Sequence, residues 1–208
     1  MNSFETDFKR AVCAKGFWAG LIIELFILFK AGFDSDLFRM SVPVLAAFPY
    51  STAWLAEYQS GFIKAYLPRS GVMSYILGKF LACTISGGFL ETLGCALYLL
   101  IKGEEAQEIN LMLIFISGML WAALSAALAA WSSSRYIAYG GSFVIYYLLV
   151  ILYERYFKEL YCLYPYEWLK PNHTWVFGEQ GIVLLLSGMI LALLCVYYEV
   201  LGRCLKRV

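Results

Sequence analysis

Six stretches of this chain are apolar for about twenty residues each, and this pattern restricts the fold more than any other feature. A helix that crosses a bilayer needs about 20 apolar residues, because each residue advances the helix by about 1.5 Å. In lipid every backbone polar group has to be satisfied within its own segment, so each stretch is predicted to be a helix. The predicted spans are approximately 12–31, 40–56, 75–101, 109–131, 136–153 and 181–201.

The composition agrees with a membrane location. Of the 208 residues, 62% are hydrophobic and 15% are charged, and the mean hydropathy is +0.69. A soluble globular domain has about a quarter of its residues charged. The net charge of +1 and the lack of a basic arm give no indication of nucleic-acid binding. We therefore expect an all-α membrane protein with one six-span transmembrane domain over residues 1–208.

An even number of spans places both termini on the same side of the membrane. In the six-span arrangement ten of the sixteen Lys and Arg residues lie on that side, so the positive-inside rule predicts cytoplasmic termini. Within residues 1–16, Phe4, Phe8 and Val12 recur at four-residue spacing. This spacing is typical of a short amphipathic helix in the membrane interface. A solvated tail is the alternative.

A polar and basic stretch, residues 57–79, begins after the second predicted span and runs into the start of the third. It is long enough for a short helix along the cytoplasmic surface, expected over 57–68, with changes of direction at Gly61 and Pro68. Such a helix can transmit a push from a soluble partner, with apolar contacts from residues such as Ile63 and charged contacts from the basic ones. The predicted contact residues are Glu57, Gly61, Phe62, Lys64, Tyr66, Leu67, Pro68 and Arg69. The alternative is a loop whose basic residues only determine the topology.

Three short patterns in this stretch resemble the cytoplasmic loop of ABC-2 type transporter permeases: Glu57-x-x-x-Gly61, residues 67–70, and Gly78-Lys79. The Pro-Ser-Arg-like break of that family is Pro-Arg-Ser here, with Arg and Ser exchanged. The stretch 163–169 is similar to an outer segment of the same family, although Tyr164 stands where Asn is usual.

The resemblance implies the permease subunit of an ATP-driven exporter, which moves a peptide, antibiotic, lipid or other amphipathic substrate outward. The chain has no G-x-x-x-x-G-K-[ST] motif. It is therefore not expected to be an enzyme, and ATP and Mg²⁺ would be bound by a separate ABC ATPase in two copies. A second permease subunit would complete a homodimer or heterodimer in a bacterial cell membrane, with residues 57–70 as the coupling segment.

A different class of protein has a similar length. The small substrate-binding subunits of energy-coupling importers also have six spans. Those subunits couple through an Ala-x-x-x-Ala face on the first span. Here Ala11, Ala14 and Ala19 form no clear face, which favours the exporter.

Acidic residues lie inside two predicted spans, where a charge costs about 2.5–3.5 kcal/mol on insertion scales. They are Glu24, near the middle of the first, and Glu91, well inside the third. Glu91 shares a stripe of small and polar residues with Thr84 and Cys95. We predict that Glu24, Thr84 and Glu91 belong to a translocation path or to an intramembrane polar network. The alternative for both glutamates is a structural role, for example as a protonated or hydrogen-bonded side chain.

Two further patterns concern helix packing. Small residues recur every four positions in the fourth span, beginning with Gly118 and Ala122 and continuing to Ala130. Such a face allows another helix to approach closely. Near the end of the sixth span, Glu199 precedes Arg203 by four residues, which predicts an ion pair.

The outer segment, residues 153–180, holds nine aromatic residues within 27 positions. That density is typical of an interfacial aromatic belt, presented here by two short helices broken near Pro165 and Pro171. By the family resemblance this segment forms an outer gate, and a membrane anchor is the alternative. The predicted gate residues are Tyr164, Pro165, Trp168 and Leu169.

Neither catalytic nor metal-binding residues are predicted. His173 is the single histidine, and it lies in a polar loop without a serine nucleophile motif nearby. The six cysteines do not show the spacing of metal ligands.

Overall fold

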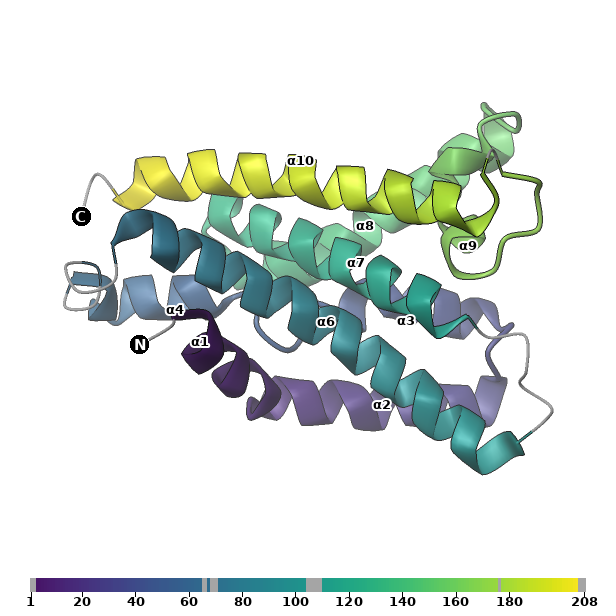
Figure 1. Cartoon of the computed structure of the whole chain (residues 1–208), viewed down its shortest axis with the longest axis horizontal. Helices are drawn as coiled ribbons and strands as arrows, with labels where there is room; N and C mark the ends of the chain where they lie inside the picture. Colours follow the sequence, from purple (N-terminus) through teal and green to yellow (C-terminus); the bar gives the residue numbers. More distant parts are fainter. Residues whose placement is uncertain (1–2, 65–66, 68–70, 104–109, 176, 206–208) are drawn as a thin grey trace.

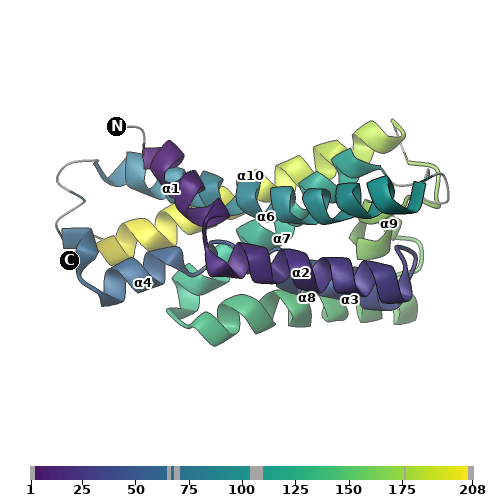
Figure 2. The same ribbon diagram turned by 90° about the horizontal axis from the view of Figure 1, so that it is seen from below.

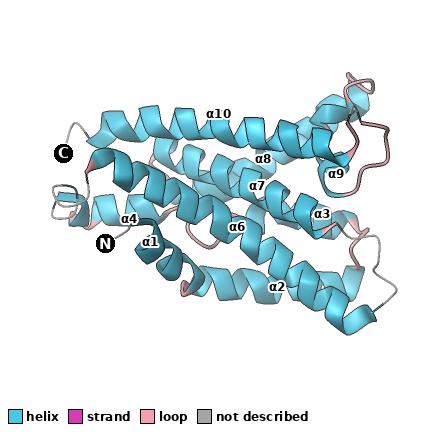
Figure 3. Ribbon diagram, viewed as in Figure 1, coloured by secondary structure: helices cyan, strands magenta, loops and turns pink. Residues whose placement is uncertain are grey.

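The computed structural model describes residues 3–64, 67, 71–103, 110–175 and 177–205. The regular secondary structure of these residues is helical; turns and loops connect the helices, and these residues contain no strand (Figure 3). The helices in chain order are α1 (Ser3–Val12), α2 (Lys15–Ala31), α3 (Asp36–Leu45), α4 (Ala53–Gln59), α6 (Val72–Lys102), α7 (Leu111–Ser132), α8 (Arg135–Arg155), the 3-10 helix η2 (Tyr161–Leu163), α9 (Pro165–Leu169) and α10 (Glu179–Leu205).

Four of these helices, α6, α7, α8 and α10, are long and apolar enough to cross a membrane. α1 and α2 pass the same test together, but they meet at an angle of 49° across a short break, and they make a fifth candidate if the bent pair is one span. The predicted spans 75–101, 109–131, 136–153 and 181–201 therefore match observed helices to within a few residues. The amphipathic helix expected near the N-terminus is also confirmed as α1.

The second predicted span, residues 40–56, is not one continuous helix. α3 ends at Leu45, residues 46–52 form turns, and α4 begins only at Ala53. The physical reason is Pro49, which has no N–H for a helical hydrogen bond and clashes with the preceding turn. Pro43 is tolerated inside α3.

The elements are elongated along one axis, and the bundle has two distinct ends (Figures 1 and 2). Both termini and α4 lie at one end, which we call the terminal end. α9 lies at the opposite end, which we call the α9 end. α6 and α7 are the most buried of the long helices, whereas far fewer residues of α8 and α10 are buried.

The contact between α6 and α7 is close because small residues face each other. A Cβ atom on Gly87 would lie 2.4 Å from the Cβ of Ala122 and 2.7 Å from the carbonyl oxygen of Ala46. A Cβ on Gly88 would lie 2.6 Å from the carbonyl oxygen of Phe115. The small-residue face predicted for the fourth span is thus confirmed, beginning at Gly118.

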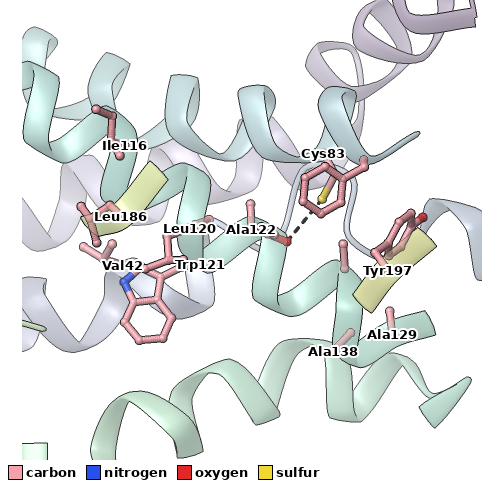
Figure 4. Packing of buried hydrophobic residues seen from close by; sticks show 14 of the residues in the cluster. Val42, Cys83, Ile116, Leu120, Trp121, Ala122, Ala129, Ala138, Leu186 and Tyr197 are labelled. Atoms are coloured by element: carbon pink, nitrogen blue, oxygen red, sulfur yellow. Dashed lines mark hydrogen bonds between the residues drawn. The ribbon is translucent and has the colours of Figure 1, made fainter. Parts of the chain in front are cut away.

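The surrounding core is built from large side chains of several helices (Figure 4). Trp121 of α7 and Tyr197 of α10 are both almost fully buried. In the same cluster, the Cys83 thiol of α6 donates to the carbonyl oxygen of Ala122 at 3.6 Å. The core therefore contains residues of α6, α7 and α10.

Candidate functional site

A buried ion-pair cluster lies at the terminal end, at the start of α6. Lys79 is only 2% exposed, and its ammonium group donates three hydrogen bonds. The acceptors are Asp7 Oδ1 at 2.8 Å, Glu57 Oε1 at 2.6 Å and the Tyr50 hydroxyl at 2.8 Å. These are short, charge-assisted contacts.

Two tyrosines and an arginine make further contacts with the two carboxylates. The Tyr50 hydroxyl donates to Asp7 Oδ1 at 2.7 Å, and the Tyr75 hydroxyl donates to Glu57 Oε2 at 2.7 Å. Arg10 approaches Glu57 from the half-exposed rim at 3.4 Å. We call these residues the Lys79 cluster: Asp7, Arg10, Tyr50, Glu57, Tyr75 and Lys79.

The Lys79 cluster joins elements that are distant in sequence. Asp7 belongs to α1, Tyr50 to the turns before α4, Glu57 to α4 and Lys79 to α6. Removing one partner of a buried ion pair leaves an uncompensated charge, so such a cluster resists separation of its elements. The first and last charged residues of the 57–79 motif therefore bind each other.

Sequence reasoning missed most of this cluster. It selected Glu57 as a contact for a soluble partner, whereas the Glu57 side chain is 15% exposed and bound within the chain. One signal was available: Asp7 lies four residues before Ala11, and both are buried on the same face of α1. The pairing of Glu57 with Lys79 has no local signal.

The prediction of one helix over 57–68 is wrong at its start. Glu57 belongs to α4, which ends at Gln59, and Gly61 has a φ of +73°, a left-handed conformation that favours glycine. A new helical stretch then begins at Phe62. The change of direction predicted at Gly61 is confirmed.

The new stretch has an inner and an outer side. Ile63 is 1% exposed and belongs to the core, and Leu67 packs against that core. Phe62 is 40% exposed, and Lys64 is exposed. Of the described predicted residues Phe62 and Leu67, only Phe62 is available for apolar contact with a partner, because Leu67 faces inward like Ile63. The other predicted residues, Tyr66, Pro68 and Arg69, lie outside the described part of the chain.

A second polar group lies in the interior between α2 and α6. Glu24 and Glu91 are both fully buried and interact electrostatically across this interface. The Cys95 thiol is 3.7 Å from Glu24 Oε1. The structure thus brings Glu24 and Glu91 together. Thr84 is not joined to them, because its hydroxyl donates to the carbonyl oxygen of Leu81 in its own helix.

At the α9 end, the predicted gate residues are packed into the bundle. Trp168 is fully buried, lies 5.8 Å from the Trp121 ring and donates from Nε1 to the carbonyl oxygen of Cys162 at 3.0 Å. Pro165 and Leu169 are buried beside it. Tyr164 stacks on Tyr153 with ring centroids 4.2 Å apart. α9 therefore packs against α7 and α8 at this end of the bundle.

Next to the gate residues, sequence reasoning missed a buried carboxylate, Glu167. Glu167 Oε2 accepts from the backbone N–H groups of Asn172 and His173 at 3.0 and 3.2 Å, and from Trp175 Nε1 at 3.4 Å. His173 Nδ1 lies 2.9 Å from Glu167 Oε1. Burial by itself raises the pKa of Glu167, but the hydrogen bonds from His173, Asn172 and Trp175 together lower the pKa by more than burial raises it. The net pKa therefore lies below the usual value.

The order of residues 165–175 should therefore depend on pH. Because the pKa of Glu167 is lower in the folded chain than in the unfolded chain, its stabilising contribution is complete above the unfolded value of about 4.5. The contribution is lost as the pH falls through the lower, folded pKa. Glu167→Gln should remove this pH dependence and cost about 1–3 kcal/mol of local stability at neutral pH.

Hydrogen exchange of residues 165–175, followed by mass spectrometry, measures this effect. The exposed Glu159→Gln is the matched control and should leave exchange unchanged. Equal protection of this segment in wild type and Glu167→Gln at neutral pH would contradict the assignment.

Taken together, four or five helices of sufficient length and apolarity are what a multi-pass helical membrane protein requires. In the described residues, no group of three or more His, Cys, Asp or Glu side chains is placed to hold a metal ion. No family model matches the chain, and neither curated proteins nor solved structures show a significant similarity to it. Functional assignment therefore depends on the geometry of the sites and on the motif of residues 57–79.

Proposed function

We propose that this chain is the permease subunit of an ATP-driven ABC exporter and moves a peptide, antibiotic, lipid or other amphipathic substrate outward across a cell membrane. A separate ATPase, present in two copies, would bind ATP and Mg²⁺. A second permease subunit, identical or different, would complete the transporter. Both termini would be cytoplasmic. The pairs α1–α2 and α3–α4 would each cross the membrane as two helices with a break between them, beside the four long helices.

One observation carries this proposal: Lys79 binds Asp7 and Glu57 at the same time. The segment that resembles the coupling loop is thereby attached to the central helix α6 and to α1. A coupling loop without such an attachment would move independently of the helices. A displacement of this segment by a partner would be transmitted to α6.

The contact surface for the ATPase would be the outward side of residues 58–64. Tyr58 and Phe62 are 45% and 40% exposed, and Lys64 is exposed between them and the start of α6. The Arg10 guanidinium lies 5.9 Å from the centre of the Phe62 ring. This surface combines aromatic and basic groups, which suits a partner cleft with apolar walls and acidic residues.

Purification of the tagged full-length chain from its native membrane tests the proposal. We expect a co-purified subunit with a nucleotide-binding motif and measurable ATP hydrolysis. Lys64→Glu should reduce the amount of bound ATPase at least about tenfold, because it reverses a charge at the contact. The control Lys102→Glu changes an exposed lysine at the other end of α6 and should have no effect.

A second variant separates binding from transmission. Glu57→Gln weakens the attachment to Lys79 but leaves the outward surface unchanged, so the ATPase should stay bound while its stimulated hydrolysis falls. A native complex without an ATPase, or full ATPase binding to Lys64→Glu, would contradict the exporter assignment. A complex that contains a further, unrelated transmembrane coupling subunit would favour the importer instead.

A further inference from the structure

Two carboxyl groups without a counter-charge lie in the interior of the helical bundle. Glu24 is the tenth residue of the seventeen in α2, and Glu91 is the twentieth of the thirty-one in α6. At about 1.5 Å per residue, each lies more than about 10 Å from either end of its helix. Both side chains are 0% exposed. In a membrane these groups would lie near the middle of the apolar layer.

The packing makes room for the two side chains. A Cβ atom on Gly94 would lie 2.2 Å from the Glu24 carboxyl carbon, so the carboxyl group occupies the space that any other residue would fill. On the other side, a Cβ on Gly118 of α7 would lie 3.1 Å from Glu91 Cγ. Glycines from α6 and α7 therefore form the recess that holds the pair.

Three of the four carboxyl oxygens have no hydrogen-bond partner: Glu24 Oε2, Glu91 Oε1 and Glu91 Oε2. The fourth, Glu24 Oε1, accepts from the Cys95 thiol at 3.7 Å. Among the described residues no Lys, Arg or His lies within ion-pair distance of either glutamate, and Cys95 is the other titratable group that interacts with them. On α7, the uncharged Gly118 lies next to Glu91.

Two adjacent carboxylates in this position would be very unfavourable. Each charge in the middle of a bilayer costs about 2.5–3.5 kcal/mol on insertion scales, and like charges at close range raise that cost. A bound cation removes the penalty. A metal ion such as Na⁺ or Ca²⁺ is usually held by about six oxygen atoms, whereas this recess offers four oxygens and a thiol. A proton needs only one carboxylate and one acceptor.

We propose that Glu24 and Glu91 form a proton-binding site within the bundle and hold at least one proton at neutral pH. The proton removes the charge of one carboxylate and converts one of its oxygens into a hydroxyl donor. Loss of the proton would place two negative charges across the α2–α6 interface and push these helices apart. Proton occupancy thus couples to the spacing of α2 and α6. This inference uses the membrane location of the bundle and does not depend on the ATPase.

Infrared spectroscopy of the full-length protein in phosphatidylcholine vesicles tests the site directly. At about pH 8, well above the ordinary glutamate pKa of about 4.3, we expect a carbonyl band of a protonated carboxyl group that shifts in D₂O. The band should be lost in the double variant Glu24→Gln/Glu91→Gln. It should persist in Glu199→Gln, which removes an exposed glutamate.

A chemical probe supplies an independent measurement that needs no variant. Dicyclohexylcarbodiimide reacts with protonated carboxyl groups in apolar surroundings, so Glu24 or Glu91 should be labelled at this pH and identified by peptide mass spectrometry. Sodium chloride and choline chloride at equal ionic strength should give the same labelling and the same infrared band.

Three outcomes would overturn the proposal. A folded wild-type protein without the protonated-carboxyl band at about pH 8 would show that both groups are charged. A band or labelling that disappears in sodium but not in choline would assign the recess to a metal cation. Retention of the band in the double variant would place the proton on another residue.

Discussion

Lys79→Met should lower the free energy of unfolding by about 3–5 kcal/mol, the usual effect of removing one member of a buried ion pair. The substitution keeps a long side chain but leaves Asp7 and Glu57, which lie 2.8 and 2.6 Å from the ammonium group, without their main counter-charge. Arg10 compensates them only in part, because its half-exposed guanidinium lies at the rim, 3.4 Å from Glu57 and 4.0 Å from Asp7. Denaturant titration of the protein in detergent micelles measures the change.

Two companion variants make this result specific. Lys64→Met removes an exposed lysine nearby and should change stability by less than about 0.5 kcal/mol. Adding Asp7→Asn and Glu57→Gln to Lys79→Met neutralises the orphaned carboxylates, so part of the stability should return. A Lys79→Met protein that unfolds like the wild type would show that the Lys79 cluster does not hold α1, α4 and α6 together.

Gly87→Leu should prevent accumulation of folded protein, and Gly87→Ala should cost about 1–3 kcal/mol. Even a single methyl group at this position would lie 2.4 Å from the Cβ of Ala122 and 2.7 Å from the carbonyl oxygen of Ala46. The latter is a backbone atom, so relief requires movement of a whole segment. Gel filtration of the membrane extract reports the folded fraction, and denaturant titration reports the free energy.

Gly140 provides a control at which alanine is expected to change the stability in the opposite direction. It is also helical, in α8, but a Cβ atom there would meet no atom within 4 Å. Gly140→Ala should therefore stabilise the chain by about 0.5–1 kcal/mol, because alanine loses less backbone freedom on folding. Equal effects of alanine at positions 87 and 140 would contradict the close α6–α7 contact.

The exposed ion pair at the end of α10 illustrates what sequence patterns predict well. Arg203 Nη2 lies 3.1 Å from Glu199 Oε2, as the four-residue spacing indicated. The small-residue face of α7 was predicted for the same reason, because helical periodicity places residues four apart on one side. Such features depend on a single helix.

The second predicted span shows where such reasoning fails. Residues 40–56 are apolar enough to span a membrane, but the turns around Pro49 divide them between α3 and α4. Both proline positions were visible in the sequence. Only the structure shows their different outcomes: Pro43 lies inside α3, whereas the chain forms turns around Pro49.

The amino-acid sequence by itself determined the helical class and the limits of α6, α7, α8 and α10, because apolar length and backbone hydrogen bonding act within each segment. Only the tertiary structure decided the partners of the charged residues. Lys79 meets Asp7 across 72 positions and Glu57 across 22, and Glu24 meets Glu91 from another helix. A charge buried in an apolar bundle requires compensation, but the group that provides it depends on which helix faces lie together.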